Sequence, residues 1–231
     1  MEQHTAYFRV TNVNKQYRRK DDPVLRNINL EAERGQCIGI LGANGCGKST
    51  LLSILAGALT ADSGTMGIGD KTYSLHHTTT IPDMGYIPQE NPLIDELSAL
   101  DNLKLWYCNS KLDLSEELNS GVLAMLGIPA FLSTPVNQMS GGMKKRLSIG
   151  CSVANAPQIL LMDEPGAALD LQCKELISSY IKNCLSEEKI VLLATHEERE
   201  IALCNTIFIL KNGSLTPFDY NGNMKKLAEM L

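Results

Sequence analysis

The strongest constraint on this chain is the stretch Gly42–Thr50, which reads GANGCGKST and directly follows the apolar run Cys37–Leu41. Four residues separate its first and last glycines, and a lysine and a serine come next, which is the pattern of a P-loop. A P-loop joins a buried strand to a helix. The sequence therefore predicts a strand before Gly42 and a helix that begins near Lys48.

Such a turn favours an anion, because several backbone N–H groups and the positive end of a helix dipole point at one place. Lys48 can reach the outer phosphates of a nucleotide, and the hydroxyl of Ser49 can bind Mg²⁺. A glycine-rich turn that binds nothing is the alternative, but the complete pattern before the apolar stretch Leu51–Leu59 favours a nucleoside triphosphate. The predicted phosphate-binding residues are Gly42, Ala43, Asn44, Gly45, Cys46, Gly47, Lys48, Ser49 and Thr50.

Composition narrows the class of protein. With 231 residues, of which 44% are hydrophobic and 20% charged, the chain can bury one sizeable core. A net charge of −5 gives no general electrostatic reason to bind nucleic acid. No apolar run approaches the roughly 18 residues of a membrane span, and the N-terminus does not resemble a secretion signal. Seven cysteines without a C-x-x-C pair suggest reduced thiols, so we expect a cytosolic protein without a nucleic-acid partner.

Hydrophobic periodicity divides the chain into three parts. Residues 6–10 and 28–32 alternate as half-buried strands do, and another strand is expected after Gly64. The middle part, from about Asn91 to Asn155, reads as helices. Ser98 and Asp101 resemble a capping box, which predicts a helix there, and a second helix is expected over Ser115–Leu126.

The third part alternates between strands and helices. Ile159–Met162, Ile190–Ala194 and Ile207–Leu210 are continuous apolar runs, and helices are expected over 171–186 and around 197–204. Apolar strands separated by helices indicate a parallel sheet covered on both faces. At the end, Met224, Leu227, Ala228 and Leu231 share one face of a predicted terminal helix.

Two acidic residues, Asp163 and Glu164, end the first of these strands. Strand ends of a parallel sheet line the ligand crevice, and buried carboxylates need a compensating cation. Asp163 is therefore expected to hold Mg²⁺ and Glu164 to polarise the attacking water. The alternative is a surface pair that caps a helix. His196 follows the strand Ile190–Thr195 at the same edge, where it could stabilise the γ-phosphate, although a lone histidine is more often a core residue.

In this order of motifs the sequence resembles the ATP-binding subunits of ABC transporters along nearly its whole length. Ser140-Gly141-Gly142 looks like the family's signature turn, and Gly85–Gln89 is similar to its Q-loop. By this resemblance, Gln89 lies near the metal and the attacking water. It also implies that Tyr17 stacks on adenine, that Asp170 belongs to the D-loop, and that His196 is the switch histidine.

The resemblance implies an α/β fold. We expect a P-loop NTPase core with a mostly parallel sheet, an N-terminal antiparallel β subdomain and a helical subdomain insertion. The chain would form one ATPase domain over 1–231, with a RecA-like core and β subdomain in 1–90 and 156–231 and the helical subdomain in 91–155. Its catalytic residues would be Glu164, His196 and Gln89, and its metal ligands Ser49, Gln89 and Asp163.

It also implies a mechanism. The cofactors would be ATP and Mg²⁺, and the signature turn, with another helix N-terminus, would complete the ATP site of a second, facing ATPase subunit. In such a homodimer or heterodimer, hydrolysis would drive separate integral membrane permease subunits. The protein would then be bacterial, cytoplasmic and peripheral at the inner face of the cell membrane, and residues 86–103 favour export.

Some residues depart from the family pattern. Met139 and Met143 stand where leucine and glutamine are usual, and Gly166-Ala167-Ala168 lacks the usual D-loop hydroxyls. Lys144, Lys145 and Arg146 read as a solvated helix face rather than a nucleic-acid patch. The alternative function is a soluble ABC ATPase without a permease, for example in iron–sulfur assembly. A cassette that binds ATP without hydrolysis is disfavoured, because Lys48 and the polar strand-end residues are all present.

Overall fold

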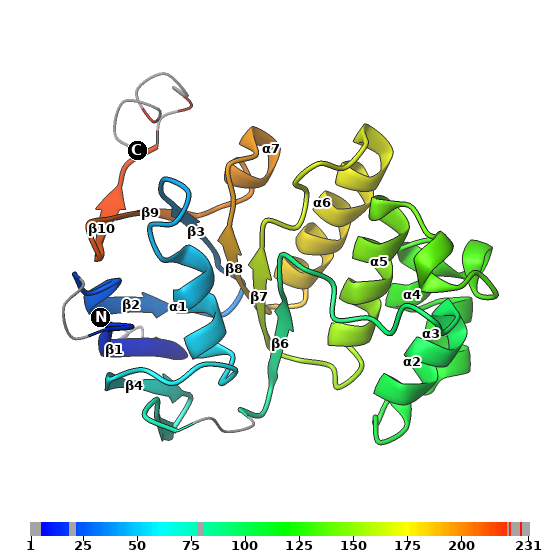
Figure 1. Cartoon of the computed structure of the whole chain (residues 1–231), viewed down its shortest axis with the longest axis horizontal. Helices are drawn as coiled ribbons and strands as arrows, with labels where there is room; N and C mark the ends of the chain where they lie inside the picture. Colours follow the sequence, from blue (N-terminus) through cyan, green and yellow to red (C-terminus); the bar gives the residue numbers. More distant parts are fainter. Residues whose placement is uncertain (1–5, 19–21, 78–80, 221, 223–226, 228–231) are drawn as a thin grey trace.

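The computed structural model describes residues 6–18, 22–77, 81–220, 222 and 227, and it contains two sheets (Figure 1). The smaller sheet is antiparallel, in the order β2-β1-β4-β5. Its strands are β1 (Phe8–Lys15), β2 (Leu25–Ala32), β4 (Ser63–Ile68) and β5 (Lys71–Ser74). The predicted antiparallel N-terminal subdomain is therefore confirmed.

The larger sheet has the order β10-β9-β3-β8-β7-β6, and all neighbours are parallel except β10 with β9. Its strands are β3 (Cys37–Leu41), β6 (Met84–Ile87), β7 (Ile159–Asp163), β8 (Ile190–Ala194), β9 (Thr206–Lys211) and β10 (Ser214–Phe218). This order puts the P-loop strand β3 directly beside β8, which ends before Thr195 and His196. The mostly parallel sheet is confirmed.

Helix α1 (Lys48–Leu55) lies between the two sheets (Figure 1). Its side chains Leu51, Leu52 and Ile54 join the buried cluster that also holds Phe8 of β1 and Ile40 of β3. One face of the larger sheet thus packs on the small sheet through this helix. The P-loop therefore lies at the start of a helix that is packed between the two sheets.

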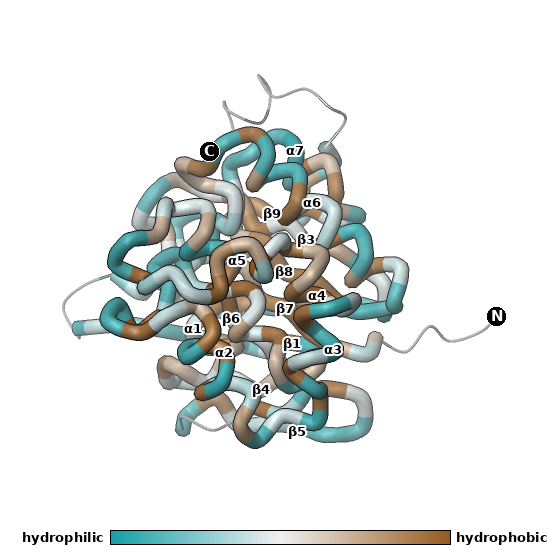
Figure 2. The backbone as a smooth tube through the Cα atoms, turned by 90° about the vertical axis from the view of Figure 1, so that its right-hand side faces the viewer, coloured by the Kyte–Doolittle hydropathy of each residue, from teal (hydrophilic) through white to brown (hydrophobic). Residues whose placement is uncertain are grey.

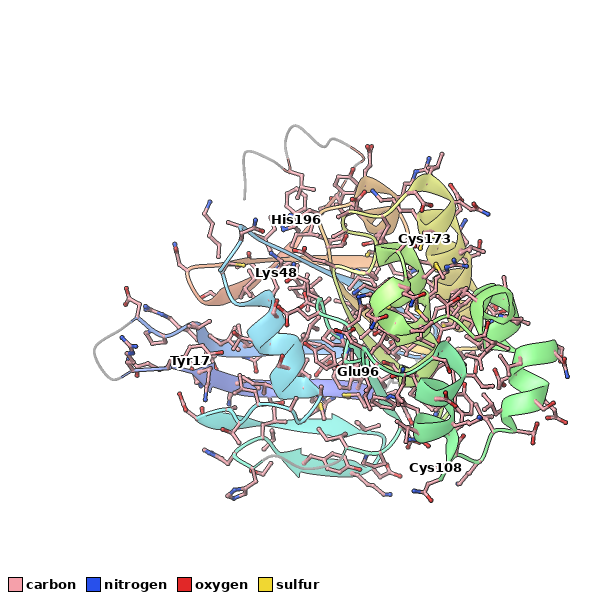
Figure 3. All side chains as sticks on the ribbon, turned by 45° about the vertical axis from the view of Figure 1, so that its right-hand side comes forward. Tyr17, Lys48, Glu96, Cys108, Cys173 and His196 are labelled. Carbon is pink, nitrogen blue, oxygen red and sulfur yellow. The ribbon has the colours of Figure 1, made fainter. Side chains whose placement is uncertain are left out.

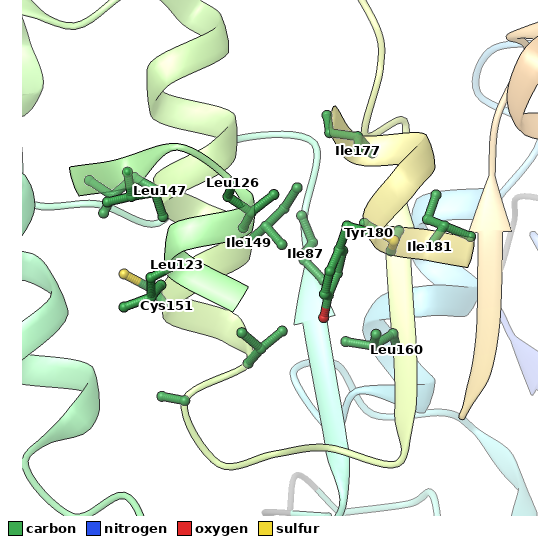
Figure 4. Packing of buried hydrophobic residues seen from close by; sticks show 14 of the residues in the cluster. Ile87, Leu123, Leu126, Leu147, Ile149, Cys151, Leu160, Ile177, Tyr180 and Ile181 are labelled. Atoms are coloured by element: carbon green, nitrogen blue, oxygen red, sulfur yellow. The ribbon is translucent and has the colours of Figure 1, made fainter. Parts of the chain in front are cut away.

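The other face of the larger sheet is covered by α6 (Leu171–Ser186), whose bounds agree with the prediction, and by a helical segment between β6 and β7. That segment contains α2 (Ala99–Tyr107), α3 (Leu114–Asn119), α4 (Val122–Met125), α5 (Gly141–Ser152) and the 3₁₀ turns Ile128–Phe131 and Val136–Gln138. Tyr180 of α6 lies between Ile149 of α5 and Leu160 of β7 in one cluster (Figure 4). The helical insertion is confirmed, and the boundaries 91 and 155 stay a prediction.

The expectation of one helix over Ser115–Leu126 is wrong, because the chain forms α3 and α4 with a break at Gly121. The Glu117 carboxylate accepts a hydrogen bond from the Val122 backbone N–H at 2.8 Å and so caps the new helix. A Cβ on Gly121 would lie 2.3 Å from that carboxylate. The side chain that ends α3 therefore requires the glycine that follows.

Near the end of the chain, the structure also differs from the helices that the sequence predicts. Helix α7 covers only Glu198–Ile201, and the predicted continuation to Cys204 consists of turns. Of the predicted terminal helix, Met224, Ala228 and Leu231 lie outside the described residues, whereas Leu227 is buried against Ile209.

Hydrophobic segments gather in the centre around β7 and β8, and hydrophilic segments lie mainly outside (Figure 2). Where the structure is described, it contains no helix long and apolar enough to cross a bilayer.

Candidate nucleotide site

The P-loop has a backbone that only glycine accommodates at two of its positions. Gly47 caps α1 with a φ of 112°, in the left-handed region that favours glycine. A Cβ on Gly42 would lie 2.4 Å from the carbonyl oxygen of Leu210 in β9. The loop therefore packs its own backbone against a neighbouring strand and starts the helix at Lys48, as the sequence predicted.

Lys48 is buried and points back into the P-loop. Its ammonium donates to the carbonyl oxygens of Gly42 at 2.7 Å and Ala43 at 3.3 Å. It also lies 3.0 Å from Nε2 of His196 (Figure 3). Because an ammonium can only donate, Nε2 of this histidine accepts and carries no proton. Burial lowers the pKa of His196, Lys48 lowers it further, and Glu164 opposes both.

Three residues predicted to be catalytic meet at the end of β7. The Gln89 side-chain nitrogen donates to Oε2 of Glu164 at 3.3 Å, and Oε1 of Glu164 lies 3.8 Å from Nε2 of His196. Glu164 has a φ of 47°, which is uncommon outside glycine, and its N–H donates to Ala194 at the end of β8. The backbone turn thus brings this carboxylate beside the histidine.

Asp163 is 2% exposed, and its carboxylate accepts a hydrogen bond from the Ser49 hydroxyl. Its Oδ1 has no hydrogen-bond partner among the residues that the structure describes. Burial raises the pKa of Asp163, and the charge of Glu164 raises it further, while the Ser49 hydrogen bond and two lysines act in the other direction. A buried carboxylate oxygen without a partner beside a hydroxyl fits a hard cation such as Mg²⁺.

The third predicted metal ligand, Gln89, is placed differently. Its amide bonds Glu164, as described above, and it shares the lining of one cleft with the P-loop. This cleft, which we call the P-loop cleft, has a volume of about 420 Å³. Its lining consists of Tyr17, Val24, Asn44, Gly45, Gly47, Lys48, Ser49, Thr50, Gln89 and Glu164.

Tyr17 supplies the aromatic surface of the P-loop cleft. Tyr17 is 57% exposed, and its hydroxyl lies 3.1 Å from Oγ1 of Thr50 in α1. An exposed aromatic residue beside the P-loop is placed where it can stack on a nucleotide base. The structure therefore brings the tyrosine and the P-loop together.

The signature turn, Ser140–Gly142, does not line this cleft. Ser140 caps α5 by accepting from the Met143 N–H at 3.3 Å, and Gly141 is exposed at the start of that helix. Asp170 caps α6 by accepting from the Cys173 N–H at 2.8 Å. Ser140, Gly142 and Asp170 line a separate small cleft of about 80 Å³. Within one chain, the structure thus separates the signature turn from the P-loop.

The prediction of a solvated face at Lys144–Arg146 is wrong. Lys145 is 4% exposed, and Arg146 packs its guanidinium over the Phe131 ring and donates to the Leu126 carbonyl at 2.9 Å. Helix α5 is enclosed by its neighbours on more than one side, so Lys145 is buried and Lys144 and Arg146 are half-buried. A signal was present, because Lys145 stands three residues after Gly142 and four before Ile149, on one helical stripe.

Sequence reasoning also missed Glu200, which is 4% exposed. Its carboxylate accepts hydrogen bonds from the Thr195 hydroxyl and the Gly166 N–H, so it joins the segment before His196 to the segment after Glu164. Burial raises the pKa of Glu200 to about 7. No motif marks this residue, since the contact depends on how α7 folds back.

Comparisons with known proteins identify the family and the fold of this chain. The family model described as "ABC transporter" matches residues 25–167. The chain is 34% identical to a Nod factor export ATP-binding protein I of Cupriavidus metallidurans, over 90% of the chain and 69% of that protein. It is 30% identical to the linearmycin resistance ATP-binding protein of Bacillus subtilis, over 88% and 66%. A bicarbonate transport ATP-binding protein of Synechocystis is 31% identical, over 90% and 76%.

Solved structures share the fold. A dimeric ATP-binding cassette in a post-hydrolysis state, bound to ADP and phosphate, has a TM-score of 0.79 at 27% identity, over 92% of this chain and 98% of that one. A nucleotide-free ABC transporter cassette has a TM-score of 0.80 at 19% identity, which bears on the fold alone. The chain spans between 60% and 69% of the length of four Nod factor export relatives. By its family match, its relatives and its fold, the chain belongs to the ATP-binding subunits of ABC transporters, which are ATPases.

Proposed function

We propose that two copies of this chain bind ATP between the P-loop of one copy and the signature turn of the other, and that hydrolysis drives a separate membrane permease. The observation that carries this proposal is the separation of the two elements within one chain. Lys48 and Tyr17 line the P-loop cleft, whereas Ser140 and Gly142 line another. A second copy is the natural source of the missing turn.

The signature turn is suited to a phosphate. It begins α5, a helix of 12 residues, and Gly141 is exposed there. A helix N-terminus with free N–H groups attracts an anion. A Cβ on Gly141 would meet only Leu169, at 4.0 Å, so the approach to these amides is open. Triphosphate bound in one copy could therefore be contacted by the turn of the other.

Within the P-loop cleft, each side chain has a proposed part. Tyr17 stacks on adenine, and the P-loop from Gly42 to Thr50 holds the phosphates. Lys48 leaves the carbonyls that it now contacts and binds the outer phosphates. Ser49 and Asp163, together with Gln89, would hold Mg²⁺, and the ion would neutralise phosphate charge.

The hydrolytic step is assigned to the three residues that meet at β7. Glu164 is the group that takes a proton from the attacking water, and Gln89 orients that carboxylate through the bond at 3.3 Å. His196 carries no proton on Nε2 while Lys48 contacts it, so departure of Lys48 toward the nucleotide frees Nε2 to take up a proton from solvent and to donate to the γ-phosphate. Asp170 would lie at the contact between the copies.

A permease is proposed to dock on the helical insertion. Leu105 and Trp106 of α2 are 52% and 43% exposed, and Ile94 is 46% exposed. The Ile94 backbone is fixed to α2, because its N–H donates to Oδ1 of the buried Asn102 at 2.9 Å. Exposed apolar side chains held on a rigid element favour a protein contact. We call Ile94, Leu105 and Trp106 the docking surface. Ile94 lies shortly after Gln89 in the chain, so a permease bound to this surface could respond to a movement of Gln89.

The comparisons support coupling to transport, since the names of several relatives refer to export or resistance and those of others to import or transport. We propose export, because relatives that match most of this chain are named for Nod factor export and for linearmycin resistance. The site of action would be the inner face of the cell membrane.

Mass measurement of Glu164→Gln tests the dimer. This variant keeps the P-loop and loses the base, so ATP should accumulate unhydrolysed and hold two copies together. Sedimentation or light scattering should show the mass doubling with Mg·ATP and returning to that of the monomer with ADP. Lys48→Ala combined with Glu164→Gln is the control and should stay monomeric. A monomer at saturating ATP would overturn the proposal.

A further inference from the structure

The side chain of Lys145 carries a deeply buried charge outside the residues discussed for ATP. Its ammonium, on a residue 4% exposed, donates to the carbonyl oxygens of Pro88 and Gln89, both at 3.0 Å. These two carbonyls belong to the Q-loop and its approach, 56 and 57 residues away in sequence. A single lysine of α5, the helix that begins with the signature turn, therefore holds the backbone of the Q-loop through two hydrogen bonds.

Removing this ammonium from water is unfavourable in free energy, and its hydrogen-bond partners and the nearby charges must offset the loss. Burial lowers the pKa of Lys145, and the charges of Asp163, Glu200 and Glu164 act in the other direction. Hydrogen bonds from a charged donor are stronger than neutral ones, so the two carbonyls are held firmly. The positive charge also lies in the field of the carboxylates at the end of β7.

Helix α5 also contacts strand β6, which leads into the Q-loop. The Ser152 hydroxyl, in its last turn, donates to the Tyr86 carbonyl of β6 at 2.9 Å. Lys145 and Ser152 thus fix α5 beside β6 and the Q-loop. Beyond this attachment, the Gln89 side chain reaches Glu164 at 3.3 Å. Lys145 thus holds the backbone of Gln89, while the side chain of Gln89 contacts Glu164.

We propose that Lys145 is a positioning residue for ATP hydrolysis, which holds the Gln89 backbone so that the Gln89 amide meets Glu164. This inference rests on the proposed roles of Gln89 and Glu164. The same contact joins the Q-loop to the helix that begins with the signature turn. A shift of the Q-loop would therefore also move α5 and Ser140 at its start, and Ser140 is proposed to serve the other ATP site.

The test compares Lys145→Met with Lys144→Met. Methionine fills a similar volume without the charge or the donors. Lys144 is the matched control, because it is half-buried on the same helix and pairs at 3.7 Å with Asp95 rather than with the Q-loop. Lys145→Arg keeps the charge and the donors and should restore most of the lost function.

Two readouts are expected to change in Lys145→Met alone. In the nucleotide-free protein, backbone hydrogen exchange of the Q-loop should become faster. With Mg·ATP, kcat should fall roughly 10–100-fold with little change in KM, because a displacement of about 1 Å can cost about 100-fold. The Lys144→Met control should match the wild type in both. Should Lys145→Met not fold, Lys145→Gln replaces it, with the same expectations.

A double mutant separates positioning from general stabilisation. If Lys145 acts through Gln89, Lys145→Met should have almost no further effect on kcat in a Gln89→Ala background. An equal loss of kcat in both backgrounds, or Q-loop exchange and kcat like those of Lys144→Met, would overturn the inference. A wild-type chain without hydrolysis would instead overturn the proposed function, and hydrogen exchange would still decide whether Lys145 holds the Q-loop.

Discussion

The ammonium of Lys48 lies 3.0 Å from Nε2 of His196, although the two residues are 148 positions apart in the chain. They meet because β3, which leads into the P-loop, is the direct neighbour of β8, which leads to the histidine. The P-loop lysine and the proposed γ-phosphate sensor therefore contact each other directly. Under the proposed function, Lys48 exchanges this contact for the phosphates of the nucleotide.

Replacing His196 should separate binding from hydrolysis. In His196→Ala, Lys48 keeps its carbonyl partners and remains able to bind phosphates, so the Kd for ATP should change only a few-fold. Loss of a positioned group at the γ-phosphate should lower kcat by about 100-fold or more. Equilibrium nucleotide binding and steady-state hydrolysis measure the two effects. A large loss of ATP affinity with kcat retained would contradict the proposed role.

Glu200 should make stability depend on pH. Its pKa is about 7 in the folded protein against 4.5 for an ordinary glutamate, chiefly through burial, with Glu197 raising and Lys174 lowering it. Between these values the folded chain binds a proton that the unfolded chain releases, so its contribution to stability is full below pH 4.5 and is lost as the pH rises through 7. The loss amounts to at most about 3 kcal/mol.

Thermal unfolding of the wild type and Glu200→Gln at pH 5 and pH 8 measures this effect. The variant has no carboxyl group to ionise, so its Tm should fall less between the two pH values than that of the wild type. Since the other titrating groups are common to both proteins, the difference isolates Glu200. Equal pH dependence in the two would refute the buried, proton-binding state of this residue.

Gly42→Ala should damage the P-loop through its packing. The added Cβ would lie 2.4 Å from the Leu210 carbonyl oxygen, an approach that requires backbone movement. We expect a lower Tm and a large loss of ATP binding. Gly67→Ala is the control, because its Cβ would meet neighbours at 3.8 Å or more in ordinary contact. Similar losses in both variants would argue against a special requirement at Gly42.

The proposed docking surface can be tested apart from the ATP site. Leu105→Ser and Trp106→Ser should leave basal hydrolysis of the isolated subunit unchanged, since neither residue lines the P-loop cleft. In membranes containing the partner permease, both should abolish the permease's effect on hydrolysis. Lys104→Gln, on the same helix and exposed, serves as the control. Full coupling in both serine variants would exclude this surface.

The sequence predicted best what local pattern determines. The P-loop, the strand ending at Asp163 and the helix Leu171–Ser186 each follow from residues close together in the chain. The meeting of Lys48 with His196 follows from strand order, which no local pattern contains. Sequence alone placed His196 at the same edge of the sheet as Glu164, and only the order of β3 and β8 made it a neighbour of Lys48.

The errors have a physical cause as well. Charge suggested exposure for Lys145, yet its ammonium is satisfied by carbonyls that a distant loop supplies. The helix expected over Ser115–Leu126 has a suitable period, but the Glu117 carboxylate competes for the N–H of Val122 and ends the first helix. In both cases specific side-chain hydrogen bonds outweigh a weak general tendency.

Shared use of one ATP site by two copies is best examined by mixing two inactive variants. Lys48→Ala should inactivate the P-loop, and Gly141→Asp should place a negative charge in the signature turn, where the structure leaves room for a side chain. Each variant alone should hydrolyse almost no ATP. Mixed in equal amounts, they should regain a substantial part of wild-type activity, because one site of the mixed dimer combines an intact Lys48 with an intact turn. A mixture as inactive as its components would show that the turn does not act on the ATP of another copy.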